Sequence, residues 1–190
     1  MKLFVDSSSK YLYIDVIDKD LKYSFNRMGK NDHSEMLVSS LEEYLKELKY
    51  TVNDIEEIYI GRGPGSYTGV RISGTFGKTI SFIKNLKFYS FSSLDYLLSS
   101  YLEKDGKYIA AIDAKKNHSY LKAIIVKDKQ VEVVLEETFA NNEIFANYPD
   151  YIVITPNEIN GNVNSILKYN LYQEEDNLEY SPNYIRSEFN

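Results

Sequence analysis

A glycine-rich loop is the part of this 190-residue sequence whose residue types best fit a ligand-binding role. It follows the apolar run at residues 58–60, precedes a helical pattern, and reads Gly61-Arg62-Gly63-Pro64-Gly65-Ser66-Tyr67-Thr68-Gly69-Val70-Arg71. Glycine lets the backbone come close to another group, and a helix N-terminus favours an anion, so such a loop can cradle a phosphate. It can equally be a packed corner, because the string matches neither G-x-x-x-x-G-K-[ST] nor G-x-G-x-x-G.

Other residues with catalytic potential are few. Ser66 follows a strand, but Gly65-Ser66-Tyr67-Thr68-Gly69 departs from the G-x-S-x-G spacing of a nucleophile elbow. The two histidines, His33 and His118, lie far apart in the sequence, and position 37, one helical turn after the first, is a leucine. Because the chain also contains no cysteine, the sequence predicts no catalytic triad, no disulfide and no metal site.

Composition favours a folded protein without an extensive nucleic-acid surface. Apolar residues make up 43% of the chain, which is typical of globular proteins. The net charge is −6 and Lys and Arg form no dense cluster, so we expect only indirect contact with tRNA. Neither a signal-peptide pattern nor a run of 18 apolar residues is found, and a cytoplasmic location without membrane contact is expected.

The loop string resembles the signature of the TsaB (YeaZ) family, bacterial partners in the threonylcarbamoyladenosine modification of tRNA. The resemblance is specific over about residues 1–120 and thin beyond them. Four further segments contribute to it: Leu3-Phe4-Val5-Asp6-Ser7-Ser8, Asp32-His33-Ser34-Glu35, Ala111-Ile112-Asp113-Ala114-Lys115-Lys116 and Pro182-Asn183-Tyr184-Ile185-Arg186.

This resemblance implies an α/β fold of the actin-like ATPase (ASKHA, ribonuclease H-like) class, with a mixed β-sheet, flanking helices and a reduced second lobe. It also implies a non-catalytic scaffold, because the family's catalytic paralogue holds a metal with an H-x-x-x-H pair that is missing here. The implied partners are the catalytic threonylcarbamoyltransferase subunit (TsaD), the ATPase accessory subunit (TsaE) and, for the chain alone, a second copy. No cofactor is implied, and the modified site would be adenosine 37 of tRNAs that read ANN codons.

An alternative function is an actin-like nucleotide-binding enzyme, an ATPase or a kinase-like protein, that uses Asp6, Asp113 and the Gly61–Gly69 loop. In such ATPases an aspartate at the end of the first strand organises Mg²⁺, and the next residues form a phosphate loop. The residues that follow Asp6 and Asp113 include no glycine, so we favour aspartates that end strands and accept hydrogen bonds from their own turns. In a third alternative, ATP or ADP binds only at the joint with a partner.

Two lobes are predicted, residues 1–103 and 104–190, with a boundary at the polar turn Lys104–Lys107. Strands at 2–6, 11–17 and 21–27 precede a helix that opens with the capping pair Asp32 and Glu35. A strand at 57–60, the loop, a helix at 68–85, a strand at 87–90 and a helix at 92–102 complete the first lobe. The second is predicted to have strands at 108–113, 119–127, 131–138 and 151–155, helical segments at 143–148 and 163–168, and a surface segment from 172 onward.

Two helices offer a candidate surface for a partner. Leu37, Leu41 and Leu45 form an apolar stripe that Met36 and Val38 broaden, which fits either a second chain or a deep core position. Glycines inside the second helix indicate close approach by another element. The predicted partner-binding residues are Met36, Leu37, Leu41, Tyr44, Leu45, Val70, Gly74 and Gly77, and the predicted motif-loop residues are Gly61, Arg62, Gly63, Pro64, Gly65, Ser66, Thr68, Gly69 and Arg71.

Overall fold

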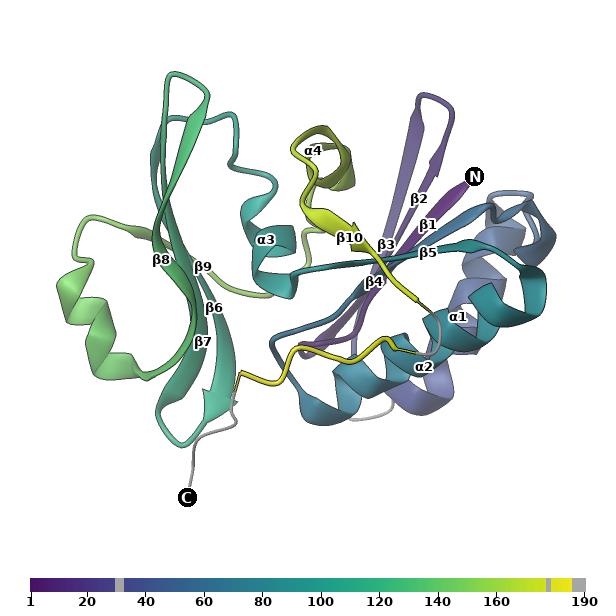
Figure 1. The fold of residues 1–190 in the computed structure, drawn as a ribbon, viewed down its shortest axis with the longest axis horizontal. Helices are drawn as coiled ribbons and strands as arrows, with labels where there is room; N and C mark the ends of the chain where they lie inside the picture. The colour runs from purple at the N-terminus through teal and green to yellow at the C-terminus, as the bar shows by residue number, and fades with distance from the viewer. Residues whose placement is uncertain (30–32, 177–178, 186–190) are drawn as a thin grey trace.

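Two β-sheets with a helix between them form the framework of the chain (Figure 1). The computed structural model describes residues 1–29, 33–176 and 179–185. The first sheet has the order β10-β5-β4-β1-β2-β3. Its strands are β1 (Lys2–Asp6), β2 (Tyr11–Asp18), β3 (Leu21–Met28), β4 (Glu57–Gly61), β5 (Lys87–Phe91) and β10 (Tyr172–Glu174).

The first sheet places the ends of three parallel strands beside one another. β1 pairs with β4 and β4 with β5 in parallel, whereas β2, β3 and β10 join as antiparallel strands. All of β1 except Lys2 is buried, as expected for a central strand that is covered on both faces. The turn after β1 and the loop after β4 therefore emerge at the same edge of the sheet.

Helices cover the two faces of the first sheet separately. On one face, α1 (His33–Glu47) and α2 (Tyr67–Lys84) pack on a core that includes Leu3, Val5 and Ile14. On the other face, α3 (Ser93–Leu98) and α4 (Val163–Lys168) contribute Tyr96 and Ile166 to an aromatic-rich core. A short 3-10 helix, η1 (Val52–Asp54), precedes β4.

The second sheet has the order β8-β7-β6-β9 and packs against the other side of α3. Its strands are β6 (Gly106–Lys115), β7 (His118–Lys127), β8 (Gln130–Asn141) and β9 (Ile152–Ile154), and the 3-10 helix η2 (Asn142–Asn147) lies over its far face. Asp128 and Lys129 both have positive φ and form the predicted two-residue hairpin turn between β7 and β8. None of the helices in the described residues is both long and apolar enough to cross a membrane.

Most predicted elements are confirmed, and α4 has the predicted bounds. The predicted helix at 92–102 is shorter, since α3 ends at Leu98, although Ser92 caps it as expected by accepting from the N–H groups of Leu94 and Asp95. The predicted capping pair is not described, because Asp32 and the side chain of Glu35 lie outside the described part of the structure.

The predicted extent of the second lobe is wrong at its C-terminal end. β10 adds to the first sheet by pairing with β5, and Tyr180 is buried in the core beneath α1 and α2. The chain therefore returns to the first lobe after building the second sheet. The sequence offers little sign of this return, because β10 is three residues long and only half-buried or exposed.

A buried carboxylate ties the segment after β9 to the first sheet. Asp15 in β2 accepts hydrogen bonds from the Ser24 hydroxyl, from the Tyr96 hydroxyl at 2.7 Å and from Asn160 Nδ2 at 3.2 Å. The Lys22 ammonium group lies 3.9 Å away. Burial raises the pKa of the Asp15 carboxyl, and these donors oppose that effect by stabilising the charged form.

Leu41→Ala should lower the free energy of unfolding by about 2–5 kcal/mol, because it leaves a cavity in the core beneath α1. The Leu41 side chain is 2% exposed. The matched control is Val38→Ala on the same helix, since Val38 is 59% exposed and should change stability by less than about 0.5 kcal/mol. Urea unfolding measures both, and equal effects would contradict the burial assigned to Leu41.

Asp15→Asn should alter the pH dependence of stability. The pKa of Asp15 is raised in the folded state. At pH values between the ordinary pKa and the raised one, the folded state therefore binds more protons than the unfolded state. The contribution of Asp15 to the free energy of unfolding then falls as the pH rises through that range. We therefore expect the free energy of unfolding of the wild type to increase relative to that of Asp15→Asn as the pH is lowered from 7 towards 4. Urea unfolding at several pH values checks this, with Asp18→Asn as control, and a difference independent of pH would contradict it.

Candidate functional site

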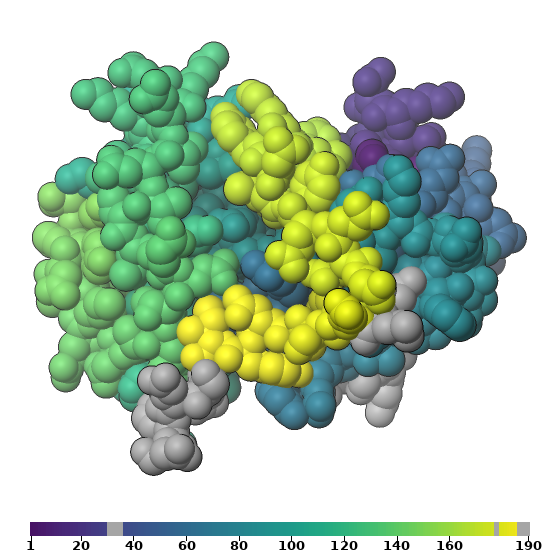
Figure 2. Space-filling model, in the orientation of Figure 1, coloured from purple at the N-terminus to yellow at the C-terminus, as the bar shows by residue number. Residues whose placement is uncertain are grey.

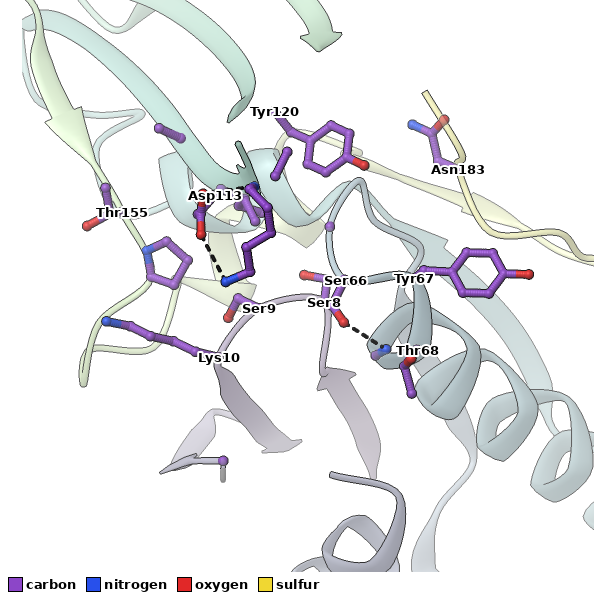
Figure 3. A pocket seen from close by; sticks show the side chains of 18 of the residues that line it. Ser8, Ser9, Lys10, Ser66, Tyr67, Thr68, Asp113, Tyr120, Thr155 and Asn183 are labelled. Carbon is purple, nitrogen blue, oxygen red and sulfur yellow. Dashed lines mark hydrogen bonds and ion pairs between the residues drawn. The ribbon is translucent and has the colours of Figure 1, made fainter. Parts of the chain in front are cut away.

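A cleft of about 1200 Å³ lies between the two lobes, at the edge where β1 and β4 end. Residues 8–10 and 65–69 of the first lobe line it, and residues 111–115 of β6 line it from the second (Figure 3). Asn183 and Tyr184 contribute from the C-terminal segment. The predicted motif loop thus forms part of the wall of a sizeable cleft, a usual kind of place for a ligand.

Three glycines of the motif loop are required by close packing within the chain itself. A Cβ at Gly69 would lie 1.9 Å from the Ser7 carbonyl oxygen, and one at Gly65 would lie 2.2 Å from that of Ser8. A Cβ at Gly61 would lie 2.3 Å from Asp6 Cγ. Of the two interpretations left open by the sequence, these contacts favour the packed corner.

Hydrogen bonds hold the loop to the β1–β2 turn at the same points. Ser66 N–H donates to the Ser8 carbonyl at 2.6 Å, and the Ser7 hydroxyl donates to the Gly69 carbonyl at 2.8 Å. Polar groups of the turn that would have to contact a phosphate in an actin-like ATPase are therefore hydrogen-bonded to the loop.

The middle of the loop is anchored to the start of α3. Gly63 has a φ of +91°, which favours glycine, and is followed by a cis peptide bond to Pro64. Gly63 N–H donates to the Ser93 hydroxyl at 3.2 Å, and Ser93 N–H donates to the Gly63 carbonyl at 2.9 Å. Both neighbours of the loop, the first turn and α3, thus fix its path.

The remaining motif residues lie on the rim of the cleft or on the outer side of the loop. Ser66 caps α2 by accepting from Gly69 N–H at 3.3 Å, so its hydroxyl has a structural role, and Thr68 is exposed on the first turn. The Arg71 guanidinium lies 4.6 Å from the centre of the Tyr67 ring. Arg62 Nη1 donates to Gln173 Oε1 at 3.1 Å, away from the cleft.

Of the two aspartates of the alternative function, Asp6 ends β1, as favoured from the sequence, whereas Asp113 lies two residues before the end of β6. Asp6 is 3% exposed and accepts from Ser8 N–H at 2.8 Å, and it is not among the residues that line the cleft. Asp113 does line the cleft, but it accepts from Lys115 N–H at 3.0 Å and pairs with the Lys115 ammonium at 3.1 Å. The Lys115 backbone N–H and then its ammonium group hold the pKa of the Asp113 carboxyl below its usual range.

Most of the side chains that line the cleft are uncharged. Among its described lining residues, hydroxyl groups predominate and Asp113 is the one carboxylate. No group of three His, Cys, Asp or Glu residues in the described chain is arranged to hold a metal ion. His118 stacks on Phe139 and contacts the Lys116 carbonyl through Nδ1 at 2.7 Å, and the side chain of His33 lies outside the described part.

The structure corrects the predicted partner-binding surface. Leu37, Leu41, Tyr44, Leu45 and Val70 are buried in the chain's own core, and Met36 is half-buried. Tyr180 packs against Gly74, while Ile60 and Phe88 pack against Gly77. The close approach predicted for these glycines is confirmed, but the approaching groups belong to the same chain.

Other residues present apolar surface on these two adjacent helices. Val38 of α1 is 59% exposed, and Phe82 and Ile83 near the end of α2 are 72% and 71% exposed. The sequence signalled Val38 as a residue outside the stripe. Ile83 lies beyond the inward-facing positions of α2, which end at Ile80 and Ser81.

Comparison with known families and curated proteins gives a consistent result. The family described as TsaD, tRNA N6-adenosine threonylcarbamoyltransferase, matches residues 27–173. The tRNA threonylcarbamoyladenosine biosynthesis protein TsaB of Haemophilus influenzae is 25% identical over 125 residues, which is 65% of this chain and 53% of that protein. TsaB of Bacillus subtilis is 27% identical over 136 residues, 71% of this chain and 59% of that protein. The chain spans little more than half the length of these relatives.

Solved structures show the same fold. A crystal structure from Pseudomonas aeruginosa, described as an uncharacterized protein with similarity to the peptidase YeaZ, has a TM-score of 0.78 at 17% identity, covering 97% of this chain and 99% of that one. YeaZ from Pseudomonas aeruginosa has a TM-score of 0.75, also at 17% identity, covering 96% and 98%. The α/β fold of the actin-like ATPase class, with mixed sheets and flanking helices, is confirmed.

Gly69→Ala should destabilise the protein by about 3 kcal/mol, the upper end for an overpacked site, since its Cβ would overlap the Ser7 carbonyl. The control is Thr75→Ala, at an exposed position of the same helix, which should change stability by less than about 0.5 kcal/mol. Thermal unfolding distinguishes them. A Gly69→Ala protein as stable as wild type would show that the loop does not need this close approach.

Proposed function

We propose that this chain, which belongs to the tRNA N6-adenosine threonylcarbamoyltransferase family and is of the TsaB (YeaZ) type, is an accessory subunit in threonylcarbamoyladenosine synthesis. It would support the enzyme that adds threonylcarbamoyl to adenosine 37 of tRNAs that read ANN codons. Its own role would be non-catalytic, as a scaffold or activator. This role would place it in the cytoplasm with the tRNA.

The observation that carries the non-catalytic part is the packing of the motif loop on the β1–β2 turn. In an active actin-like ATPase this turn and its aspartate must face the nucleotide. Here Gly65 and Gly69 fit against the turn so closely that a Cβ would overlap its carbonyl oxygens. Asp6 is directed into its own turn behind Gly61. These contacts are compatible with the fold of the lobe. They also use, within the chain itself, the turn and the aspartate that the alternative ATPase or kinase function would need.

The partner surface that we propose is the exposed apolar part of α1 and α2. Val38, Phe82 and Ile83 lie on two helices that pack side by side on one face of the first sheet (Figure 1). Exposed apolar side chains on neighbouring helices are candidates for a protein contact where they form one patch. We assign this surface to the catalytic subunit (TsaD) and, for the isolated chain, to a second copy, with the ATPase subunit (TsaE) joining the assembly.

Contact with tRNA would be indirect, through these partners. The net charge of −6 opposes tight binding to a phosphate backbone. Within the cleft, the Lys115 ammonium group is already paired with Asp113. The scaffold therefore supports the reaction through the shape that it offers to the catalytic subunit.

The test is reconstitution of the tRNA modification with the catalytic subunit, the ATPase subunit and tRNA. Modified tRNA should form only when this chain is present. Ile83→Glu should lower the yield at least about 10-fold, because a charge in a buried contact costs more than about 1.4 kcal/mol. Its matched control is Ile152→Glu, since Ile152 is 56% exposed on the second sheet and should leave the yield unchanged.

Two results would contradict this function. Modification at the full rate without the chain would remove its role as an activator. Turnover of ATP by the isolated chain with Mg²⁺, lost in Asp113→Asn, would support the alternative enzyme. Equal effects of Ile83→Glu and Ile152→Glu would refute only the proposed surface.

A further inference from the structure

The last described residues, 179–185, form a segment that crosses from one lobe to the other, here called the C-terminal strap. It follows β10 at the edge of the first sheet, passes over α2 and ends beside the second sheet (Figure 1). In the space-filling view it lies across the boundary between the lobes (Figure 2). Its residues Asn183 and Tyr184 also line the cleft.

The strap begins in the core of the first lobe. Tyr180 is 7% exposed and packs against the ring of Phe88, with 5.2 Å between ring centres. Gly74 of α2 leaves the space for it, because a Cβ there would lie 2.7 Å from Tyr180 Cε1. The Tyr184 ring contacts the exposed Tyr67 ring at 5.3 Å. The strap therefore packs along α2 from its middle to its first turn.

Asn183 links the two lobes directly. Its N–H donates to the Arg62 carbonyl of the motif loop at 2.8 Å, and its Nδ2 donates to Glu137 Oε2 of β8, also at 2.8 Å. Two residues further, Ile185 packs against the core of the second lobe. Asn183 thus joins the motif loop, through its backbone, to the outer strand of the second sheet, through its side chain, beside the cleft.

Where the strap packs on the first lobe, two buried polar atoms of the described chain lack a hydrogen-bond partner. Among the described side chains, the Tyr180 hydroxyl and Arg62 Nε are buried without a hydrogen-bond partner. Such groups cost free energy in the folded state, so they reduce the net stabilisation that the seated strap provides. The other connection between the lobes has no such defect at its centre, because the Tyr13 hydroxyl donates to the Asn157 carbonyl at 2.7 Å and accepts from its N–H at 3.0 Å.

We propose that the strap is a releasable clamp that sets the width of the cleft, and that Asn183 is its positioning residue. When Asn183 holds both Arg62 and Glu137, the lobes are closed around the cleft. When it releases Glu137, the β8 side of the second sheet moves away from the motif loop, and the cleft widens. Because the strap also packs on α2, anything that displaces α2 against the strap favours opening, and any ligand that bridges the cleft favours closure.

The lack of cysteine makes a direct measurement of the clamp straightforward. Spin labels attached at Thr79→Cys in α2 and Glu132→Cys in β8, both at exposed positions, would report the distance between the lobes. Double electron–electron resonance measures this distance. In this doubly labelled protein, Glu137→Ala and Asn183→Ala should each shift or broaden the distance distribution by ~2 Å or more, the scale of a domain rearrangement. Combining them should add little, since both remove the same bond.

Three further variants separate the clamp from a general loss of stability. Glu137→Gln keeps an oxygen acceptor for Asn183 and should retain the closed distribution. Asn183→Asp places two carboxylates opposite each other and should open the lobes most, an effect that salt reduces. Glu136→Ala, at the exposed neighbour of Glu137, should change nothing. Folded Glu137→Ala and Asn183→Asp proteins with the wild-type distribution would overturn the proposal, as would equal opening in Glu136→Ala.

Discussion

The fold depends on the close approach between the motif loop and the first β-turn. Gly69 lies against the Ser7 carbonyl and Gly65 against that of Ser8 at distances that leave no room for a side chain. This contact fixes the N-terminus of α2 relative to β1, and with it the wall of the cleft that the first lobe provides. The same loop also helps to position the second lobe. Gly63 is hydrogen-bonded to the start of α3, and the Arg62 carbonyl accepts a hydrogen bond from Asn183.

The same contact is compatible with the fold of an actin-like ATPase but engages groups that such an ATPase would use to bind a nucleotide. An actin-like ATPase uses the turn after its first strand and the cleft between its lobes to hold a nucleotide. Here the turn is used to hold the loop, and Asp6 and Asp113 accept hydrogen bonds from the N–H groups two residues onward. A lobe of this class can therefore be retained for its shape, with the groups that would react engaged in its own turns. This is the property expected of a subunit that supports a catalytic relative.

Local sequence patterns predicted most of the secondary structure, whereas contacts between residues far apart in the sequence could not be predicted. Except for β10, the strands of both sheets follow from local patterns, the bounds of α4 were predicted, and Gly74 indicated a close neighbour. That neighbour, Tyr180, could not be identified, since it lies more than a hundred positions away in an acidic segment without periodicity. Likewise, the stripe at Leu37 and Leu41 looks the same whether its cover is the chain's own sheet or a partner, and only burial distinguishes them.

The return of the chain to the first lobe has a mechanical consequence. If residues 104–190 formed an independent lobe, a single link after α3 would connect the halves and their angle would be free. Instead, the Asp15 cluster and the Tyr13–Asn157 pair fix one crossing, and the strap fixes another. A partner bound at the proposed surface of α1 and α2 would contact a helix that also carries the strap. Binding energy at that surface can therefore reach the cleft through Tyr180 and Asn183, without any residue of the partner entering it.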